Sequence, residues 1–563
     1  MTFALDTHYD VVIIGSGFGG ATTAARLAET GKRVLVLERG NHLPRERDNW
    51  SSQAVFAQAK YTAAETFYDL RDRPFRPQLH CYVGGNSKVY GAALLRLLPR
   101  DFAVVTHAQG RSPAWPLTYD ELEPYYVRAE HLFRVHGIHG EDPFAGPSSQ
   151  PYPYPPVLHE PRVQRLSDDL ERVGLHPFHL PLGVHLTQDP SGRATPDSRC
   201  IRCDRVDGYR CLVGAKDDAD SAVSHPAFAT HPTLTLLTNT TAHRLITDAS
   251  GHTVTGVAVT LPDGAPHVFT SDVMVLSAGS ILSAALLLAS ANDRHPNGLA
   301  NSSDQVGRNY MRHNNMALVA FSREPNPTVF QKTLALNDFY GPGDHWDYPM
   351  GHIQMLGKSD GWQIKSAAPR GLRWQPSAPY SETARHAVDF WLTSEDLPLS
   401  QSRVTVRPDG TIRLALQPRN NTKALSRLRK TFQRYLEQLG MVDVRPVRSP
   451  YLHKAFDVAA TARQAGTVRF GTDPESSVLD LRCKAHDLDN LYVVDGGFMP
   501  SVGAVNPTLT IIANALRVGD HIAERIGAAA SAPKANPERP HSVDTTVPPA
   551  REATNRPNQG NRP

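Results

Sequence analysis

Short apolar runs, each bounded by glycine or polar residues, recur near both ends of this chain. Residues 11–14 and 34–37 are uninterrupted runs of Val, Ile and Leu, as expected for strands that are buried on both faces of a parallel sheet. Residues 490–495, NLYVVD, predict a third buried strand that ends in a carboxylate. The longest apolar stretch covers residues 273–289, but Ser-Ala-Gly-Ser interrupts it at 277–280. A buried strand, a turn and a helix therefore fit it better than a membrane span, which needs about 20 apolar residues.

The middle of the chain changes its pattern. Residues 233–280 alternate between apolar and polar positions and contain a Pro-Asp-Gly turn, which predicts a β-meander closed by a buried strand. Residues 404–416 are predicted to form a hairpin around Asp409-Gly410. Residues 145–195 are rich in Pro and His and are predicted to be irregular. Residues 316–455 are richer in aromatic residues, Pro and His, and we interpret this block as a second lobe.

Helices are predicted where the apolar period changes to 3.6 residues. Thr118 and Glu121 form a capping box at the start of a helix in the stretch 115–137. Residues 421–439 predict an amphipathic helix. Asn506 is expected to be the N-cap of the last helix, with Pro507 at its first position.

Composition narrows the class of protein. A chain of 563 residues is too long for one simple hydrophobic core, so we expect two or more lobes. A hydrophobic content of 40% and a charged content of 20% fit a globular enzyme. The net charge of +3, from 59 basic and 56 acidic residues, gives no electrostatic argument for nucleic acid or an anionic membrane. The first ten residues lack the basic and apolar regions of a signal peptide, so we expect a cytoplasmic protein. Residues 528–563 are expected to be disordered.

Three of the five cysteines lie close together in CIRCDRVDGYRC, as Cys200, Cys203 and Cys211. A Cys-x-x-Cys pair is typical of metal or iron–sulfur ligands, but three thiolates without a histidine in the loop leave the set one ligand short. A redox disulfide and simple packing remain open, and we predict no metal.

A glycine-rich turn joins the first apolar run to a helix. In the frame Gly-x-Gly-x-x-Gly, Gly15 permits the tight turn, Gly17 lets a pyrophosphate approach the backbone, and Gly20 allows close helix packing. Glu38 follows the second apolar run, where a carboxylate can bind ribose hydroxyls. This combination predicts a dinucleotide site at the start of the helix. The alternative is that the glycine turn serves only close packing.

Several stretches together resemble the glucose–methanol–choline (GMC) oxidoreductases, a family of FAD-dependent alcohol oxidases and dehydrogenases. They run to about residue 526 in the family's order: DVVIIGSGFGGATTAARLAETGKRVLVLERG, VGGNSKVYGAALLR, WPLTYDELEPYY, LSAGSILSAALLLAS, VGRNYMRH, AGTVRFGTDP and NLYVVDGGFMPSVGAVNPTLTIIANALRVGDHI. The resemblance implies oxidation of a CH–OH group in an alcohol, sugar or sterol-like small molecule, by hydride transfer to flavin N5. The electron acceptor, oxygen or a redox partner, is not identified by the sequence.

The resemblance also implies the architecture. It predicts an α/β fold in which a Rossmann-like FAD-binding domain is built from separated segments, with an α+β substrate-binding domain that contains an antiparallel sheet. We expect the FAD-binding domain at residues 1–155, 195–315 and 456–527, and the substrate-binding domain at 156–194 and 316–455. FAD is expected to be non-covalent, because VGGNSKVYGA contains no histidine at the place where relatives form a link.

By the same resemblance, the adenosine end of FAD would lie at the first glycine turn and Glu38, and the isoalloxazine beside Gly84 and Gly85. The start of the last helix suits an anionic reduced flavin, because a helix N-terminus carries positive partial charge. The residues predicted to bind the cofactor are Gly15, Gly17, Phe18, Gly19, Gly20, Glu38, Arg39, Gly84, Gly85, Ser87, Ala242, Ala278, Asp495, Gly496, Asn506, Pro507 and Thr508.

The predicted catalytic residues are Asn506 and Arg463, and Arg463 departs from the family pattern. The family places a histidine base in His-x-x-Gly-Thr, but this chain reads Arg463-Gln-Ala-Gly-Thr. Arginine cannot act as a general base, although it can bind a carboxylate or stabilise an alkoxide. Three interpretations stay open: alcohol oxidation with Asn506 and another group such as a nearby histidine, an anionic substrate or different flavin reaction, or FAD binding with little activity. The other histidines considered, His313, His453 and His486, are interpreted as structural.

Overall fold

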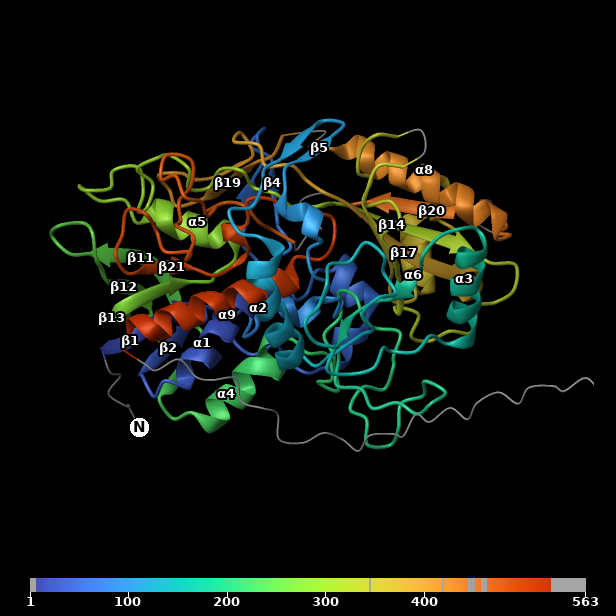
Figure 1. The fold of residues 1–563 in the computed structure, drawn as a ribbon, viewed down its shortest axis with the longest axis horizontal. Helices are drawn as coiled ribbons and strands as arrows, with labels where there is room; N and C mark the ends of the chain where they lie inside the picture. The colour runs from blue at the N-terminus through green and yellow to red at the C-terminus, as the bar shows by residue number, and fades with distance from the viewer. Residues whose placement is uncertain are drawn as a thin grey trace, which may run out of the picture.

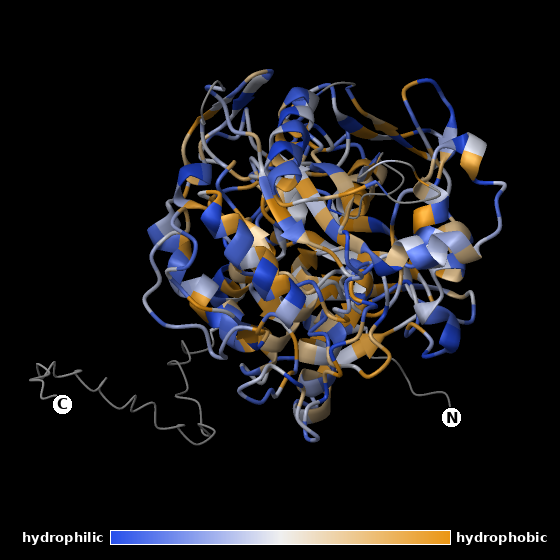
Figure 2. Cartoon of the chain, turned by 90° about the vertical axis from the view of Figure 1, so that its right-hand side faces the viewer, coloured by the Kyte–Doolittle hydropathy of each residue, from blue (hydrophilic) through white to orange (hydrophobic). Residues whose placement is uncertain are grey.

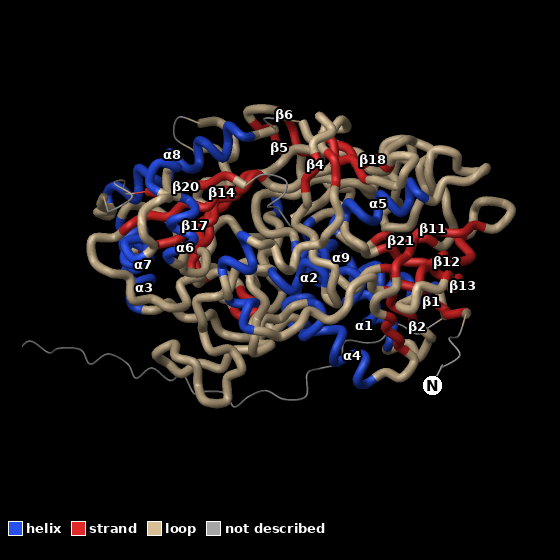
Figure 3. Tube along the Cα trace, turned by 180° about the vertical axis from the view of Figure 1, so that it is seen from behind, coloured by secondary structure: helices blue, strands red, loops and turns tan. Residues whose placement is uncertain are grey.

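The computed structural model describes residues 7–343, 346–417, 420–443, 447, 449, 451–456 and 463–527. Two β-sheets lie at opposite ends of the molecule, and helices α2 (Tyr119–Leu132) and α9 (Thr508–Arg525) run between them (Figure 1). The view from behind shows the same arrangement (Figure 3). The tail predicted at residues 528–563 lies outside the described residues.

The first sheet confirms the α/β prediction. Its strand order is β10–β2–β1–β13–β12–β11, with β21 beside β13, and the pairings among β10, β2, β1, β13 and β21 are parallel. The strands are β1 (His8–Ile14), β2 (Val34–Leu37), β10 (Leu234–Leu237), β11 (Thr241–Thr247), β12 (Val254–Thr260), β13 (Pro266–Leu276) and β21 (Leu491–Val493). The predicted meander is only partly correct: β11, β12 and β13 are antiparallel, whereas β10 pairs in parallel with β2 at the edge of the sheet.

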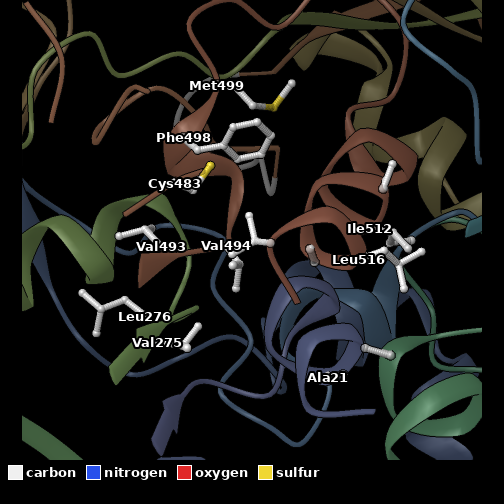
Figure 4. Packing of buried hydrophobic residues seen from close by; sticks show 14 of the residues in the cluster. Ala21, Val275, Leu276, Cys483, Val493, Val494, Phe498, Met499, Ile512 and Leu516 are labelled. Atoms are coloured by element: carbon white, nitrogen blue, oxygen red, sulfur yellow. The ribbon is translucent and has the colours of Figure 1, made fainter. Parts of the chain in front are cut away.

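Helices α1 (Phe18–Ala28) and α9 pack together against this sheet. Ala21 of α1 lies close to Ile512 and Leu516 of α9, beside the apolar side chains of β13 and β21 (Figure 4). The interrupted apolar stretch is the end of β13, a turn and α5 (Ser280–Ala289), as predicted. Among the described residues, no helix combines the length and apolar character needed to cross a membrane.

The second sheet is antiparallel and has the order β20–β14–β17–β16–β15–β8. Its strands are β8 (Phe178–His179), β14 (Asn314–Phe321), β15 (Leu334–Leu336), β16 (His352–Met355), β17 (Ala387–Ser394) and β20 (Tyr451–Ala455). Alternate residues of β14, such as Met316 and Leu318, join an apolar cluster with helices α3 (Pro161–Arg172) and α8 (Thr422–Gln438). Apolar residues gather in the interior of the molecule and hydrophilic ones outside it (Figure 2).

Helix α3 corrects the prediction of an irregular stretch at 145–195. Pro161 occupies its first turn, and Val163, Leu166 and Leu170 are spaced along one face and buried under the second sheet. The predicted hairpin is confirmed as β18 (Arg403–Val406) and β19 (Ile412–Ala415).

The remaining elements are β3 (Phe67–Tyr68), β4 (Pro74–Phe75), β5 (Val105–His107), β6 (Gly110–Ser112), β7 (Val135–His136), β9 (Leu182–Gly183), α4 (His225–Thr230), α6 (Gly361–Ala367) and α7 (Ala378–Arg385).

Candidate active site

A cavity of about 860 Å³ is lined by residues from both sheets. One end is formed by the turn after β1, the end of β2 and the segment after β13, and the other end by β14, β16, β17 and α6. Every predicted site residue lines this cavity except Gly20 and Gly84, which lie behind its wall.

The first glycine turn has the geometry that a bound dinucleotide needs. Gly15 has a φ of +102°, and a Cβ there would lie 2.3 Å from the carbonyl oxygen of Ser277. A Cβ at Gly17 would meet nothing within 4 Å, so this position faces open space. Gly20 serves packing, because its Cβ would lie 2.0 Å from the Gly15 carbonyl oxygen.

The Glu38 carboxylate is held in place beside this turn. It accepts hydrogen bonds from the Ser16 hydroxyl at 2.6 Å and from the Gly40 N–H at 2.9 Å. Burial raises the pKa of Glu38, while these hydrogen bonds oppose the shift. Arg39 also lines the cavity, and its guanidinium contacts Glu65 at 2.6 Å and the Cys81 sulfur at 3.1 Å.

The second glycine turn lies against the first. The Gly84 N–H donates to the Ser16 hydroxyl at 3.0 Å, and a Cβ on Gly85 would lie 3.6 Å from the Gly17 Cα. The Ser87 hydroxyl donates to the Gly84 carbonyl oxygen at 2.5 Å, which fixes the turn from within. The two turns therefore form one narrow backbone wall of the cavity.

The end of the chain returns to this wall. Asp495 accepts from the N–H groups of Gly279 at 3.0 Å and Gly497 at 2.8 Å, and burial raises its pKa. The prediction that Asn506 caps the last helix is wrong: Pro507 is the N-cap residue and α9 begins at Thr508. The Asn506 side chain lies in the cavity instead, where Gln354 and the Ala93 carbonyl oxygen are its partners.

The inner face of the second sheet closes the other end of the cavity. Asn315 and Ala317 on β14, Gln354 on β16 and Trp391 on β17 all point to it, because they occupy alternate, paired positions. The Gln354 Nε2 donates to the Asn506 Oδ1 at 3.4 Å. The sheet thus presents amide groups to the same space that the glycine turns border.

Arg463 lies beside this amide pair. Its guanidinium stacks on the Trp391 ring, 5.7 Å from the centroid, and donates to the Thr393 hydroxyl at 3.3 Å. Among the described residues, no carboxylate lies within ion-pair distance of it. Burial lowers the pKa of Arg463 to about 10, which leaves it protonated at neutral pH.

Two buried histidines, His313 and His352, lie near enough to Arg463 for its charge to lower their pKa values. Asn337 donates to Asp142 at 2.6 Å, so its oxygen accepts from the His352 Nδ1 at 2.8 Å. With Nδ1 donating to Asn337, the His352 Nε2 is left as an acceptor, and the Gln354 side chain is its polar neighbour on β16. Burial, followed by the charge of Arg463, lowers the pKa of His352 to about 3, and the same causes lower that of His313 to about 3.

Comparison with known proteins identifies the family. Models of the GMC oxidoreductases match residues 183–315 and 398–515, and a model of NAD(P)-binding Rossmann-like domains matches residues 13–49. The chain is 31% identical to 6'''-hydroxyparomomycin C oxidase of Streptomyces lividus, over 93% of this chain and 93% of that protein. The chain belongs to the GMC oxidoreductase family. Its cofactor is FAD, and it acts on CH–OH donors.

Other members of the GMC family are also similar over most of their length. Paromamine 6'-oxidase of Streptomyces fradiae is 28% identical, with 92% of each chain covered. Fructose dehydrogenase large subunit of Gluconobacter japonicus is 26% identical, covering 91% of this chain and 97% of that protein. The solved structure of pyridoxine 4-oxidase from Mesorbium loti has a TM-score of 0.61 at 20% identity and covers 92% of this chain and 99% of that one. It supports the fold alone.

The described residues of this GMC protein fit FAD. The cavity offers open space at Gly17, a buried carboxylate at Glu38 and the N-terminus of α9. It also contains His80, which sequence reasoning missed. The Nδ1 of His80 contacts the Tyr61 carbonyl oxygen at 2.9 Å, so its Nε2 is left as an acceptor that has no partner in the described part of the chain. Burial lowers the pKa of His80 to about 4, and the neutral ring can accept from a cofactor hydroxyl.

Sequence reasoning also missed Gln354 and His352. The signal was available in HIQM, where two polar residues alternate with two apolar ones as in a strand with one polar face. Their proximity to Arg463 and Asn506 required strand pairing that the sequence does not reveal. His453 is exposed on β20, and His486 contacts the Ser477 hydroxyl at 3.0 Å, so neither joins the cavity.

Cys81 lines the cavity, and so do Asp204, Asp207, Gly208 and Tyr209 in the loop that carries Cys203 and Cys211. Cys200, Cys203 and Cys211 carry free thiols, and burial raises the pKa of Cys200 to about 11. Within the described ranges, no cluster of three or more His, Cys, Asp or Glu side chains has the arrangement of a metal site.

Proposed function

We propose that this protein oxidises the CH–OH carbon of a sugar or similar polyhydroxylated alcohol, held in the cavity between its glycine turns and the second sheet. One observation carries the proposal: Asn506, Gln354 and Arg463 line the cavity where the polar face of the sheet meets the cofactor end. Relatives named fructose dehydrogenase and paromamine 6'-oxidase support a hydroxylated substrate. When bound, FAD supplies the acceptor for the hydride that leaves the carbinol carbon.

The protein's own groups would orient the hydroxyl. The long hydrogen bond between Gln354 and Asn506, 3.4 Å, leaves both amides able to rotate toward a substrate oxygen. Arg463 adds positive charge beside them, and negative charge develops on that oxygen as its proton leaves. These three side chains therefore stabilise the alkoxide-like oxygen.

The hydroxyl proton needs a different acceptor, because arginine and the amides are not bases. We assign this role to His352, whose hydrogen bond to Asn337 directs the bare Nε2 away from that residue. His352 and Gln354 share one face of β16, but Gln354 lines the cavity and His352 does not. Because its pKa is about 3, His352 would take the proton only as negative charge on the substrate oxygen offsets the charge of Arg463. This arrangement replaces the histidine that the family has at the position of Arg463.

Three finer statements complete the proposal. We assign residues 1–155, 195–315 and 456–527 to the FAD-binding domain, and 156–194 and 316–455 to the substrate-binding domain. FAD is bound without a covalent link, since residues 83–92 contain no histidine. The cytoplasmic location expected from the sequence stays a prediction.

An anaerobic flavin-reduction screen tests the function. FAD-loaded full-length protein is mixed with sugars, polyols, aryl alcohols and sterols, and the loss of visible flavin absorbance is followed. We expect bleaching by polyhydroxylated compounds, slowed when the carbinol carbon carries deuterium, and about 100-fold slower in Asn506→Ala with FAD retained. Bleaching by no compound in the panel contradicts the proposal and favours an FAD-binding protein with little activity.

A further inference from the structure

We propose that Arg463 forms a carboxylate-binding subsite, so that the preferred substrate is an alcohol or sugar that also carries a carboxylate. This inference rests on the proposed function and adds the chemical class of the substrate. It starts from a half-buried cation that lines the cavity and makes no ion pair with a carboxylate among the described residues.

An enclosed charge without a counter-ion is costly, and proteins normally pair such groups. Two buried cations of this structure have such partners: Lys88 contacts Asp218 at 3.0 Å, and Arg96 contacts Glu130 at 2.6 Å. The charge of Arg463 contributes to lowering the pKa of Lys332, and Lys332 pairs with Asp207. Lys216 is buried without a carboxylate, but its ammonium donates to the carbonyl oxygens of Tyr90, Val206 and Tyr209. Arg463 differs in that it lines the cavity and has one hydrogen bond among the described residues.

The donors of Arg463 suit a carboxylate. A guanidinium has five N–H donors in a planar fork, and among the described residues Arg463 uses one of them, on the Thr393 hydroxyl. The guanidinium carbon lies over the Trp391 ring, 5.7 Å from its centroid, so the ring restricts one side of the fork. A fixed fork with free donors binds a carboxylate through two parallel hydrogen bonds.

The surroundings favour an anion over a cation. Lys358 and the exposed Lys454 also line the cavity. Asp207 lines the same region and its charge raises the pKa of Arg463 against the effect of burial, but it pairs with Lys332 and accepts from the Gly357 N–H at 2.9 Å. An amine-bearing compound at this position would meet Arg463 as a like charge, so the subsite discriminates by repulsion as well as by attraction.

Binding can be measured apart from catalysis with benzoate and benzamide, which share a ring and differ in charge. The FAD-loaded full chain is titrated with each while the flavin spectrum and the melting temperature are followed. We expect benzoate to bind roughly 10- to 100-fold tighter than benzamide, with this preference lost in Arg463→Gln and partly kept in Arg463→Lys. Arg128→Gln is the matched control, since Arg128 stacks on Tyr125 at 5.4 Å outside the cavity.

Equal affinity for the two compounds, binding of neither, or a preference that survives Arg463→Gln overturns the subsite. If Arg463→Gln binds less FAD but keeps the preference for benzoate, then Arg463 serves FAD binding and the subsite is also overturned. Flavin reduction by glucuronate, glucose and glucosamine then separates the two proposals. If glucose reduces the flavin at least as fast as glucuronate, the proposed function stands and the carboxylate subsite is rejected. If benzoate binds but no alcohol reduces the flavin, the subsite stands and the proposed function is rejected.

Discussion

The hydroxyl of Tyr340 donates to the Asp101 carboxylate at 2.9 Å while it accepts from the Ala504 N–H at 2.6 Å. A Cβ on Gly503 would lie 2.7 Å from this hydroxyl, so the loop and the tyrosine fit closely. Because Asn506 follows two residues after Ala504, this buried contact positions the amide that we assign to catalysis. The link joins residues that are 239 positions apart in the chain.

Tyr340→Phe should therefore disturb the position of Asn506. The change removes the hydroxyl that satisfies a carboxylate and a backbone N–H, which costs about 1–3 kcal/mol in the free energy of unfolding. We expect slower flavin reduction with FAD retained, measured by stopped-flow absorbance, and a lower urea midpoint. Tyr435→Phe on α8 is the control, because no hydrogen bond of its hydroxyl is found among the described residues. An unchanged reduction rate in Tyr340→Phe contradicts the positioning role.

Two buried carboxyls make stability depend on pH. Burial raises the pKa of Asp101 to about 7, with the Glu395 charge adding to the shift, and burial raises that of Asp396 to about 7. The folded state then binds more protons than the unfolded state between about pH 4 and 7, so the free energy of unfolding should fall as pH rises through this range. Urea unfolding between pH 4 and 8 measures the slope. Asp101→Asn should flatten it, whereas the exposed Asp409→Asn should not. Stability that rises steadily across this window contradicts the assignment.

Glu38→Gln should weaken FAD binding. The carboxylate lies beside the first glycine turn, and the amide that replaces it offers one oxygen instead of two to Ser16, Gly40 and the cofactor. We expect a Kd for FAD about 10- to 100-fold higher, measured by flavin fluorescence during titration of the apoprotein. Glu65→Gln, which changes only an ion pair with Arg39, should leave the Kd unchanged. Equal FAD affinity in Glu38→Gln and the parent would remove Glu38 from the cofactor site.

His352→Ala should slow flavin reduction by about 100-fold, because it removes the proton acceptor. A merely structural loss would not be reversed by a small base, so partial rescue by added imidazole is the decisive readout. Asn337→Leu should also slow the reaction, since it frees the His352 tautomer. His453→Ala is the control, because His453 is exposed on β20. Failure of imidazole to restore any rate, with the protein folded and FAD bound, argues against His352 as the acceptor.

Much of the cofactor site was predictable because its determinants are local. The spacing of Gly15, Gly17 and Gly20 and the position of Glu38 specify a strand, a turn and a helix, and the structure has all three. The capping box of Thr118 and Glu121 is likewise formed within four residues. Conformational preference and hydrogen bonding over a few positions decide such features, so the sequence alone sufficed.

The catalytic end of the cavity depended on tertiary structure. The sequence singled out Arg463 and Asn506 but assigned Asn506 to a helix cap, and it passed over Gln354 and His352. Only the tertiary packing of the second sheet against the segment before α9 brings Gln354 to Asn506, across 152 positions of the chain. Local propensity says nothing about such pairings, because their free energy comes from burial and hydrogen bonds that exist only after the chain has folded. The sequence by itself thus determined which cofactor this protein holds, whereas the fold decided which side chains meet the substrate.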